Sequence, residues 1–159
     1  METQTIESPT QKSSTVTEYL NEYLANYQIH YQKLRGCHWN ITGTNFFPLH
    51  DKFEELYTHA QITIDELAER IIILEAAPLS TFLEFLEHST IKEIATVGVQ
   101  DIDMIKSILG DFKLLISLER KILQLTADTG DDGTNDMVNS FMQYKEKNSW
   151  MLRAFCEKK

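Results

Sequence analysis

Apolar residues recur at steps of three and four along most of the 159-residue chain, as they do in amphipathic helices that bury one face. The first such set is Val16, Tyr19, Leu20, Tyr23, Leu24, Tyr27 and Tyr31. Thr15 and Glu18 have the spacing of a capping box. The pattern therefore predicts a helix from Thr15 to about Asn40, where the sequence Thr-Gly-Thr-Asn interrupts it.

A second helix is predicted from near Pro48, a residue suited to a first helical turn, to about Glu75, with Pro78 ending it. Its core stripe consists of Phe53, Leu56, Tyr57, Ala60, Ile64, Leu67, Ile71 and Leu74. After Pro78, Thr81 and Glu84 form another capping box, so the pattern predicts a short helix inside the connection that follows.

The third long helix is predicted from Asp101 to about Ala127, and an acidic loop over residues 129–134 leads into a fourth that ends near Phe155. The inward positions of the third are Ile105, Ile108, Leu109, Phe112, Leu115, Ile122 and Leu125. Four long helices with a short one between the second and third predict an all-α four-helix bundle. Residues 1–14 are polar and aperiodic, which predicts a flexible tail before one domain over residues 15–159.

The composition narrows the function classes. A formal net charge of −9 argues against nucleic-acid binding and suits a surface that attracts cations. The two cysteines, Cys37 and Cys156, form no paired motif, so reduced thiols are expected. The N-terminal residues lack the features of a signal peptide, and no apolar run is long enough to span a membrane. These observations predict a soluble, cytoplasmic protein.

Candidate metal ligands lie on one stripe of the second predicted helix. At about 100° per residue, Glu54, Asp65 and Glu69 fall within roughly 100° of His50. His50 with Glu54, and Asp65 with Glu69, are each separated by four residues, so each pair can converge on one ion. Imidazole and carboxylate ligands together suit Fe, Mn or Zn, and the ligand types alone do not choose among them.

The two pairs cannot meet within one helix. Fifteen residues separate His50 from Asp65, which is about 22 Å along the axis at 1.5 Å per residue, whereas metal–ligand bonds are about 2 Å. An antiparallel copy of the same helix would set one pair against the other and make two identical sites per dimer. The chain contains no Glu-x-x-His, the motif of single-chain di-iron bundles. A metal site would therefore be shared between subunits.

The same residues have plainer interpretations. Acids on a helix stripe often form only a solvated face, and a histidine near a helix start often has only a packing role. His38, between Cys37 and Trp39, can equally be a satisfied interior residue. Residue spacing alone leaves both interpretations open.

The chain resembles the Dps family of mini-ferritins, the DNA-binding proteins from starved cells, from about residue 17 to residue 156. The resemblance lies in His38-Trp-Asn, Asn45-Phe-Phe-x-Leu-His50, Lys52-Phe-Glu-Glu-Leu-Tyr57, Ile64-Asp-Glu-x-Ala-Glu-Arg70, Pro78 with Ser80-Thr-x-x-Glu84, Gly130-Asp-Asp-x-Thr-Asn-Asp-Met137 and Trp150-Met-x-x-Ala-Phe155. The spacing from His38 to His50, Glu54, Asp65 and Glu69 is the family's ferroxidase signature.

This resemblance implies a ferritin-like fold and a homo-dodecameric cage that protects against oxidative damage. The family's cages oxidise Fe(II) to Fe(III) with hydrogen peroxide or dioxygen, preferring peroxide, and store the ferric mineral. It also implies that His38, His50 and Glu54 of one subunit share iron with Asp65 and Glu69 of its two-fold mate. Glu54 stands where many relatives carry Asp, which leaves a disabled or non-iron site as an alternative.

The resemblance further implies that Asp131, Asp132 and Asp136 line a three-fold iron-entry pore. Their alternative role is an exposed helix start, where acids favour the helix dipole. Trp39 resembles an aromatic residue that traps stray oxidising equivalents, or else it is a core residue anchoring the helix end. His30, His59 and His88 match no ligand position and are expected to be structural or surface residues.

DNA compaction is a further alternative function. DNA-binding relatives often carry a tail rich in Lys and Arg, but residues 1–14 hold Lys12 against Glu2 and Glu7. Twelve chains would carry a charge on the order of −100, which repels DNA at physiological salt. DNA binding is therefore expected to be negligible.

Overall fold

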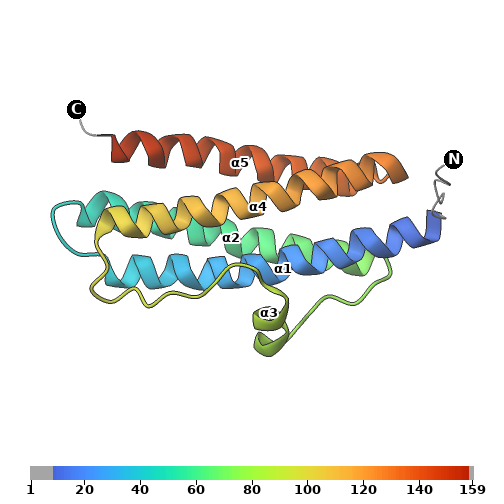
Figure 1. The fold of residues 1–159 in the computed structure, drawn as a ribbon, viewed down its shortest axis with the longest axis horizontal. Coiled ribbons are helices and arrows are strands. Elements are labelled where there is room, and N and C mark those ends of the chain that lie inside the picture. The colour runs from blue at the N-terminus through green and yellow to red at the C-terminus, as the bar shows by residue number, and fades with distance from the viewer. Residues whose placement is uncertain (1–8, 158–159) are drawn as a thin grey trace, which may run out of the picture.

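The computed structural model describes residues 9–157, and its side chains from residue 15. Four long helices lie roughly along one direction in Figure 1: α1 (Pro9–Asn40), α2 (Phe46–Ile73), α4 (Asp101–Thr129) and α5 (Asp132–Cys156). A short helix, α3 (Phe82–His88), stands to one side in the connection from α2 to α4. The predicted all-α four-helix bundle with a short helix in its long connection is confirmed.

The first helix starts earlier than its sequence pattern predicts. It begins at Pro9 rather than at Thr15, so Thr15 lies inside the helix and does not cap it. Proline suits a first helical turn, because its nitrogen has no hydrogen to leave unpaired there. Of the predicted flexible tail, residues 1–8 lie outside the described residues, and the domain boundary at residue 15 stays a prediction. The capping box at Thr81 is confirmed, with Thr81 Oγ1 accepting from the Glu84 backbone and the Glu84 carboxylate accepting from that of Thr81.

The connection between α2 and α4 determines the topology. Figure 1 shows that α1 and α2 run antiparallel. Residues 74–100 then pass back along the length of the bundle, so α4 runs in the same direction as α2. Asn26 of α1 holds this crossover: its Oδ1 accepts hydrogen bonds from the backbone nitrogens of Thr90 (3.0 Å) and Ile91 (2.9 Å). Asn21 likewise binds the backbone of Ala77 and Leu79. The crossover is thus attached to α1 by side-chain amides.

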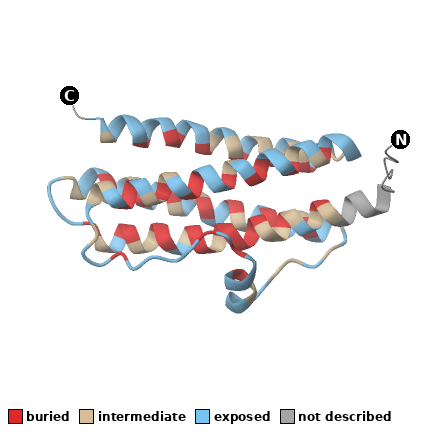
Figure 2. Ribbon diagram, in the orientation of Figure 1, coloured by how far each residue is buried: buried red, intermediate tan, exposed pale blue. Residues whose placement is uncertain are grey.

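The core lies between the four long helices, and Figure 2 shows buried positions recurring along each of them. From the predicted stripes, the buried residues are Phe53, Leu56, Ala60, Leu67 and Ile71 of α2 and Ile105, Ile108, Phe112, Leu115 and Ile122 of α4. The remaining predicted positions, Tyr57, Ile64, Leu74, Leu109 and Leu125, are partly buried and pack against this core. Within the described residues, no helix is long and apolar enough to cross a membrane.

The centre of the bundle also holds charged groups. Lys145 of α5 is fully buried and forms an ion pair with Glu119 of α4 at 2.5 Å. Tyr23 of α1 donates a hydrogen bond to the same Glu119 oxygen, and Lys145 donates one to the Tyr27 hydroxyl at 2.7 Å. Buried charges are stable only when they are paired in this way. The apolar core therefore also contains one ion pair with two tyrosine hydroxyls bound to it.

Candidate metal centre

Two histidines meet where α1 ends and α2 begins. The turn over residues 41–45 is short, so His38 in the last turn of α1 lies against His50 in the first turns of α2. His38 Nδ1 lies 2.8 Å from the backbone oxygen of His50, and His50 Nδ1 lies 2.9 Å from that of His38. The two rings stack with centroids 3.7 Å apart. Each histidine thus holds the other.

These reciprocal bonds determine which nitrogen carries the hydrogen when each ring is neutral. A carbonyl oxygen only accepts, so each Nδ1 carries the hydrogen and donates it. In a neutral imidazole the other nitrogen then has a free lone pair, which makes Nε2 the metal-binding atom. The carbonyl of His38 is one of those that a helix end leaves without a partner, and the His50 ring satisfies it.

Neighbouring aromatic rings restrict the orientation of the two histidines. Phe46 stacks on His50 with centroids 4.9 Å apart, and Tyr57 meets His38 edge-on at 5.2 Å. His38 is only 9% exposed, so its ring has little freedom to turn. The pair is held in place by packing as well as by hydrogen bonds.

Glu54 completes a group of three donors. It lies one turn after His50 on α2, and one ligand atom each from His38, His50 and Glu54 all fall within 4.8 Å of one another. Two ligands of a single ion at bonds of about 2 Å lie up to about 4 Å apart, and the exposed Glu54 side chain has room to turn toward the two histidines. Two histidines and one carboxylate are the donor set of many non-haem Fe(II) sites.

Asp65 and Glu69, the remaining predicted ligands, lie elsewhere on the protomer. Both are exposed on α2 and neither belongs to the group of three around His50. Because α2 runs unbroken from Phe46 to Ile73, the axial separation of about 22 Å holds for the folded chain. The protomer therefore brings three donors together and leaves two acids facing outward.

Trp39 and the other three histidines lie outside the one group of possible metal ligands found among the described residues. Trp39 is 57% exposed, with the Arg35 guanidinium 4.8 Å from its ring centroid, so the interpretation as a core aromatic is wrong. His30 is buried against Asp111, and His59 stacks on Tyr144 at 3.4 Å, as expected for structural residues. His88 is exposed and binds the backbone of its own helix.

The thiol of Cys37, beside His38, has low reactivity. Cys37 is buried and unpaired in the structure, as is the half-buried Cys156. Burial raises the pKa of the Cys37 thiol to about 12, although the nearby Lys33 ammonium opposes that shift. A protonated thiol is a poor nucleophile, so Cys37 is protected from oxidants that reach the metal centre.

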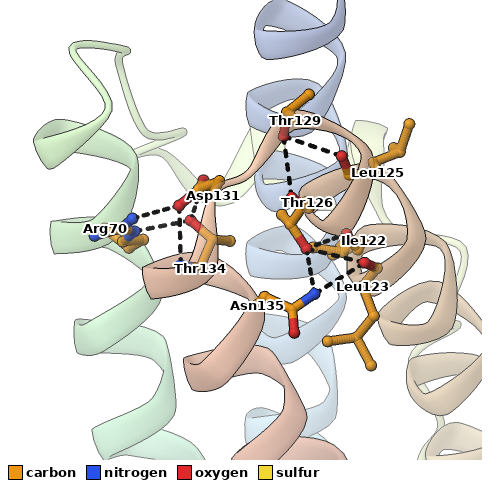
Figure 3. Close-up of polar contacts among 9 residues, drawn as sticks. All are labelled: Arg70, Ile122, Leu123, Leu125, Thr126, Thr129, Asp131, Thr134 and Asn135. Atoms are coloured by element: carbon orange, nitrogen blue, oxygen red, sulfur yellow. Dashed lines mark hydrogen bonds and ion pairs between the residues drawn. The ribbon is translucent and has the colours of Figure 1, made fainter.

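The predicted pore acids are not equivalent. Figure 3 shows that Asp131 points at Arg70 of α2 and at Thr134, and its Oδ1 lies 2.7 Å from the Arg70 Nη2. It also caps α5 by accepting from the Thr134 backbone at 3.1 Å. Asp132 and Asp136 are exposed at the start of α5. Asp131 thus has a structural role in the protomer, while a pore role for all three stays a prediction.

Nearby polar contacts tie the turn between α4 and α5. Asn135 of α5 donates from Nδ2 to the Thr126 hydroxyl (2.8 Å) and to the Leu123 carbonyl (2.9 Å), as Figure 3 shows. Gly130 at the turn has a φ of 70°, which favours glycine. These contacts join the start of α5, which Asp131 caps, to the end of α4.

Replacing Asp131 with Asn is expected to lower stability by about 1 kcal/mol, because the amide can still cap α5 but no longer pairs its charge with Arg70. Burial raises the pKa of Asp131, but the hydrogen bonds from Thr134 and Arg70 outweigh it and hold the pKa below its ordinary 3.8. A depressed pKa gives stability that is present above pH 3.8 and lost as the pH falls through the folded-state value. Denaturant unfolding should therefore show a difference in the free energy of unfolding between wild type and Asp131→Asn, and this difference should become smaller as the pH is lowered. Asp132→Asn is the matched control. A difference in unfolding free energy that stays constant with pH contradicts the structural role given to the Asp131 carboxylate.

Comparison with known proteins finds matches over nearly the whole chain. A family model of the ferritin-like domain matches residues 17–159. The chain is 44% identical to the DNA protection during starvation protein of Brevibacillus brevis, over 89% of this chain and 95% of that protein. The solved Dps protein of Vibrio cholerae O1, described as a member of a broad superfamily of ferritin-like diiron-carboxylate proteins, matches with a TM-score of 0.89 at 42% identity, over 93% of this chain and 92% of that one. A solved Dps protein from Bacillus brevis gives a TM-score of 0.90 at 37% identity, over 96% and 100%.

Proposed function

Because the chain belongs to the Dps family of ferritin-like proteins, we propose that it is a ferroxidase that oxidises Fe(II) to Fe(III) and stores the ferric product in a dodecameric cage. The observation that carries the proposal is the reciprocal bonding of His38 and His50. It presents two Nε2 lone pairs beside the Glu54 carboxylate. This is a site prepared for a divalent cation before any cation arrives.

The proposed site is completed by a second copy of the chain. Three donors leave coordination positions of a metal ion open. Asp65 and Glu69 are exposed on α2, too far along the helix to reach the group of three donors in the same chain. In a two-fold dimer with antiparallel α2 helices, these acids of one subunit face His50 and Glu54 of the other. Carboxylate oxygens are hard donors, and they stabilise Fe(III) more than Fe(II). The second subunit therefore favours the oxidised product.

Hydrogen peroxide is the oxidant that the site suits best. Peroxide takes up two electrons, and two Fe(II) ions held side by side supply one each, so little hydroxyl radical is released. Among the predicted pore residues, Asp132 and Asp136 have carboxylates accessible to incoming iron.

Anaerobic addition of Fe(II) followed by peroxide tests this function. Ferric absorbance should rise with few hydroxyl-radical spin adducts, and the solution mass should be that of a dodecamer. Competition among Fe, Zn and Mn for the metal-free protein, read by bound-metal analysis, addresses the alternative of a non-iron site. A monomer, or a protein that leaves Fe(II) oxidation at the background rate, contradicts the proposal.

The names of the relatives raise DNA binding as a second function, but the charge of this chain opposes it. At −9 per chain, a cage repels the phosphate backbone. We expect no mobility shift of plasmid DNA at neutral pH and moderate salt. A shift that persists there, and weakens as salt is raised, would show that local basic groups overcome the net charge.

A further inference from the structure

A groove between α4 and α5 carries positive charge on an otherwise acidic protein. It encloses about 420 Å³, within the range of small-molecule sites, and it shares no residue with the His38–His50–Glu54 group. Its cations are Lys113 and Arg120 of α4 and Arg153 of α5, against a single acid, Glu146. The groove therefore has a formal charge of +2 on a chain whose net charge is −9.

The cations of this α4–α5 groove are free to bind an anion. Lys113 and Arg153 form no ion pair with any carboxylate in the described part of the chain. Arg120 pairs with Glu146 at 3.2 Å, but both side chains are about half exposed or more, so water screens that pair. A bound oxyanion can displace Glu146 from Arg120 at little cost in free energy. Guanidinium groups are suited to bind phosphate through bidentate hydrogen bonds.

The floor of the groove offers both a polar and an apolar contact. Ser149 lines it and is 8% exposed, yet its hydroxyl makes no hydrogen bond with any described residue. The hydroxyl oxygen is not one of the fully buried, unpartnered polar atoms of the described residues, so it is open to the groove and accessible to a bound molecule. Leu109 and Ile116 supply an apolar surface beside it. Phosphate alone would leave that surface uncovered.

We propose that the α4–α5 groove binds a small organic phosphate, with the phosphate held by Lys113, Arg120 and Arg153 and the apolar portion resting on Leu109 and Ile116. Ser149 donates to, or accepts from, the polar edge of the bound molecule. Nucleoside monophosphates have this combination of a compact anion and a flat, weakly polar body, and they fit the volume of the groove.

Calorimetric titration of the assembled, metal-free protein with AMP tests the proposal. The double variant Lys113→Gln/Arg153→Gln should bind AMP about tenfold or more weakly, because two charge-assisted contacts are lost. Lys121→Gln/Lys147→Gln is the matched control: it removes the same charge from the same two helices outside the groove and should bind as wild type does. Equal weakening in both double variants, or no binding by wild type, overturns the proposal.

Three further probes define the ligand class. Inorganic phosphate should bind more weakly than AMP because it leaves the apolar floor uncovered, and adenosine more weakly still because it lacks the anion. Ser149→Ala should weaken AMP binding several-fold while the thermal midpoint stays near that of wild type. Phosphate binding as tightly as AMP overturns the organic part of the assignment, and plasmid DNA displacing AMP at moderate salt overturns a small-molecule role.

Discussion

A co-expressed mixture of His50→Ala and Asp65→Ala chains is expected to regain about a quarter of the wild-type rate of peroxide-dependent Fe(II) oxidation. Each variant alone should be about tenfold slower or worse, because each site loses a ligand. In a mixed two-fold dimer one site combines both defects, while the other takes His50 from one chain and Asp65 from the other and is intact. Random pairing makes half of the dimers mixed, and half of the sites in those dimers are restored.

This complementation separates a shared site from one built within a single chain, where mixing restores nothing. Glu66→Ala is the matched control for Asp65→Ala, since Glu66 is the next residue, equally exposed, and is turned about 100° away on the helix. It should oxidise Fe(II) at the wild-type rate. If the mixture oxidises Fe(II) no faster than the average of its two parents, the proposed sharing is wrong. If Asp65→Ala alone matches wild type, Asp65 is no ligand.

Replacing Lys145 with Met is expected to lower the free energy of unfolding by about 3–5 kcal/mol, the cost of breaking a buried ion pair on one side. Lys145 and Glu119 are both fully buried, and Glu119 Oε2 already lacks a hydrogen-bond partner. Without the ammonium, the carboxylate has no counter-charge in the core. Lys147→Met, an exposed position on the same helix, should change stability by less than about 0.5 kcal/mol.

The pH dependence of the stability of Lys145→Met tests whether the uncompensated Glu119 charge causes the loss of stability. Burial raises the pKa of Glu119, and in wild type Lys145 opposes the rise. Removing Lys145 raises the pKa further, so the carboxyl binds a proton on folding. A raised pKa gives stability that is complete below the ordinary value of 4.5 and is lost as the pH rises through the folded-state value. Urea unfolding should show a penalty that grows from acidic to neutral pH.

A double variant, Lys145→Met with Glu119→Leu, is expected to regain most of the lost stability, because it removes the uncompensated charge and keeps the volume filled. The hydroxyls of Tyr23 and Tyr27 lose partners in this variant, so the recovery should be incomplete. A double variant less stable than Lys145→Met alone contradicts the ion-pair explanation.

Local sequence patterns were sufficient to predict the positions of the helices. Periods of three and four residues, with capping signals such as Thr81 and Glu84, depend on neighbours in the chain, so the elements are predictable to within a few residues. The exception is the start of α1. A capping box at Thr15 is a local option that competes with continuation of the helix, and the helix continues to Pro9.

The candidate site was partly predictable for the same reason. Helical rise and rotation are constants, so the convergence of His50 with Glu54 and the distance to Asp65 follow from residue numbers. The joining of His38 to His50 needed a short turn between two helices, which the break after Asn40 indicated. If all five predicted ligands belong to one site, as we propose, their spacing requires a second subunit.

The sequence by itself determined the helical bundle, the placement of its apolar stripes and the ligand spacing that no single helix can close. Only the tertiary structure decided which nitrogen each histidine presents, that Asp131 binds Arg70, and that Lys145 neutralises Glu119 in the core. Those outcomes depend on side chains brought together from different helices. Spacing along one helix carries no information about contacts across the bundle, because packing between helices, and not sequence neighbours, selects them.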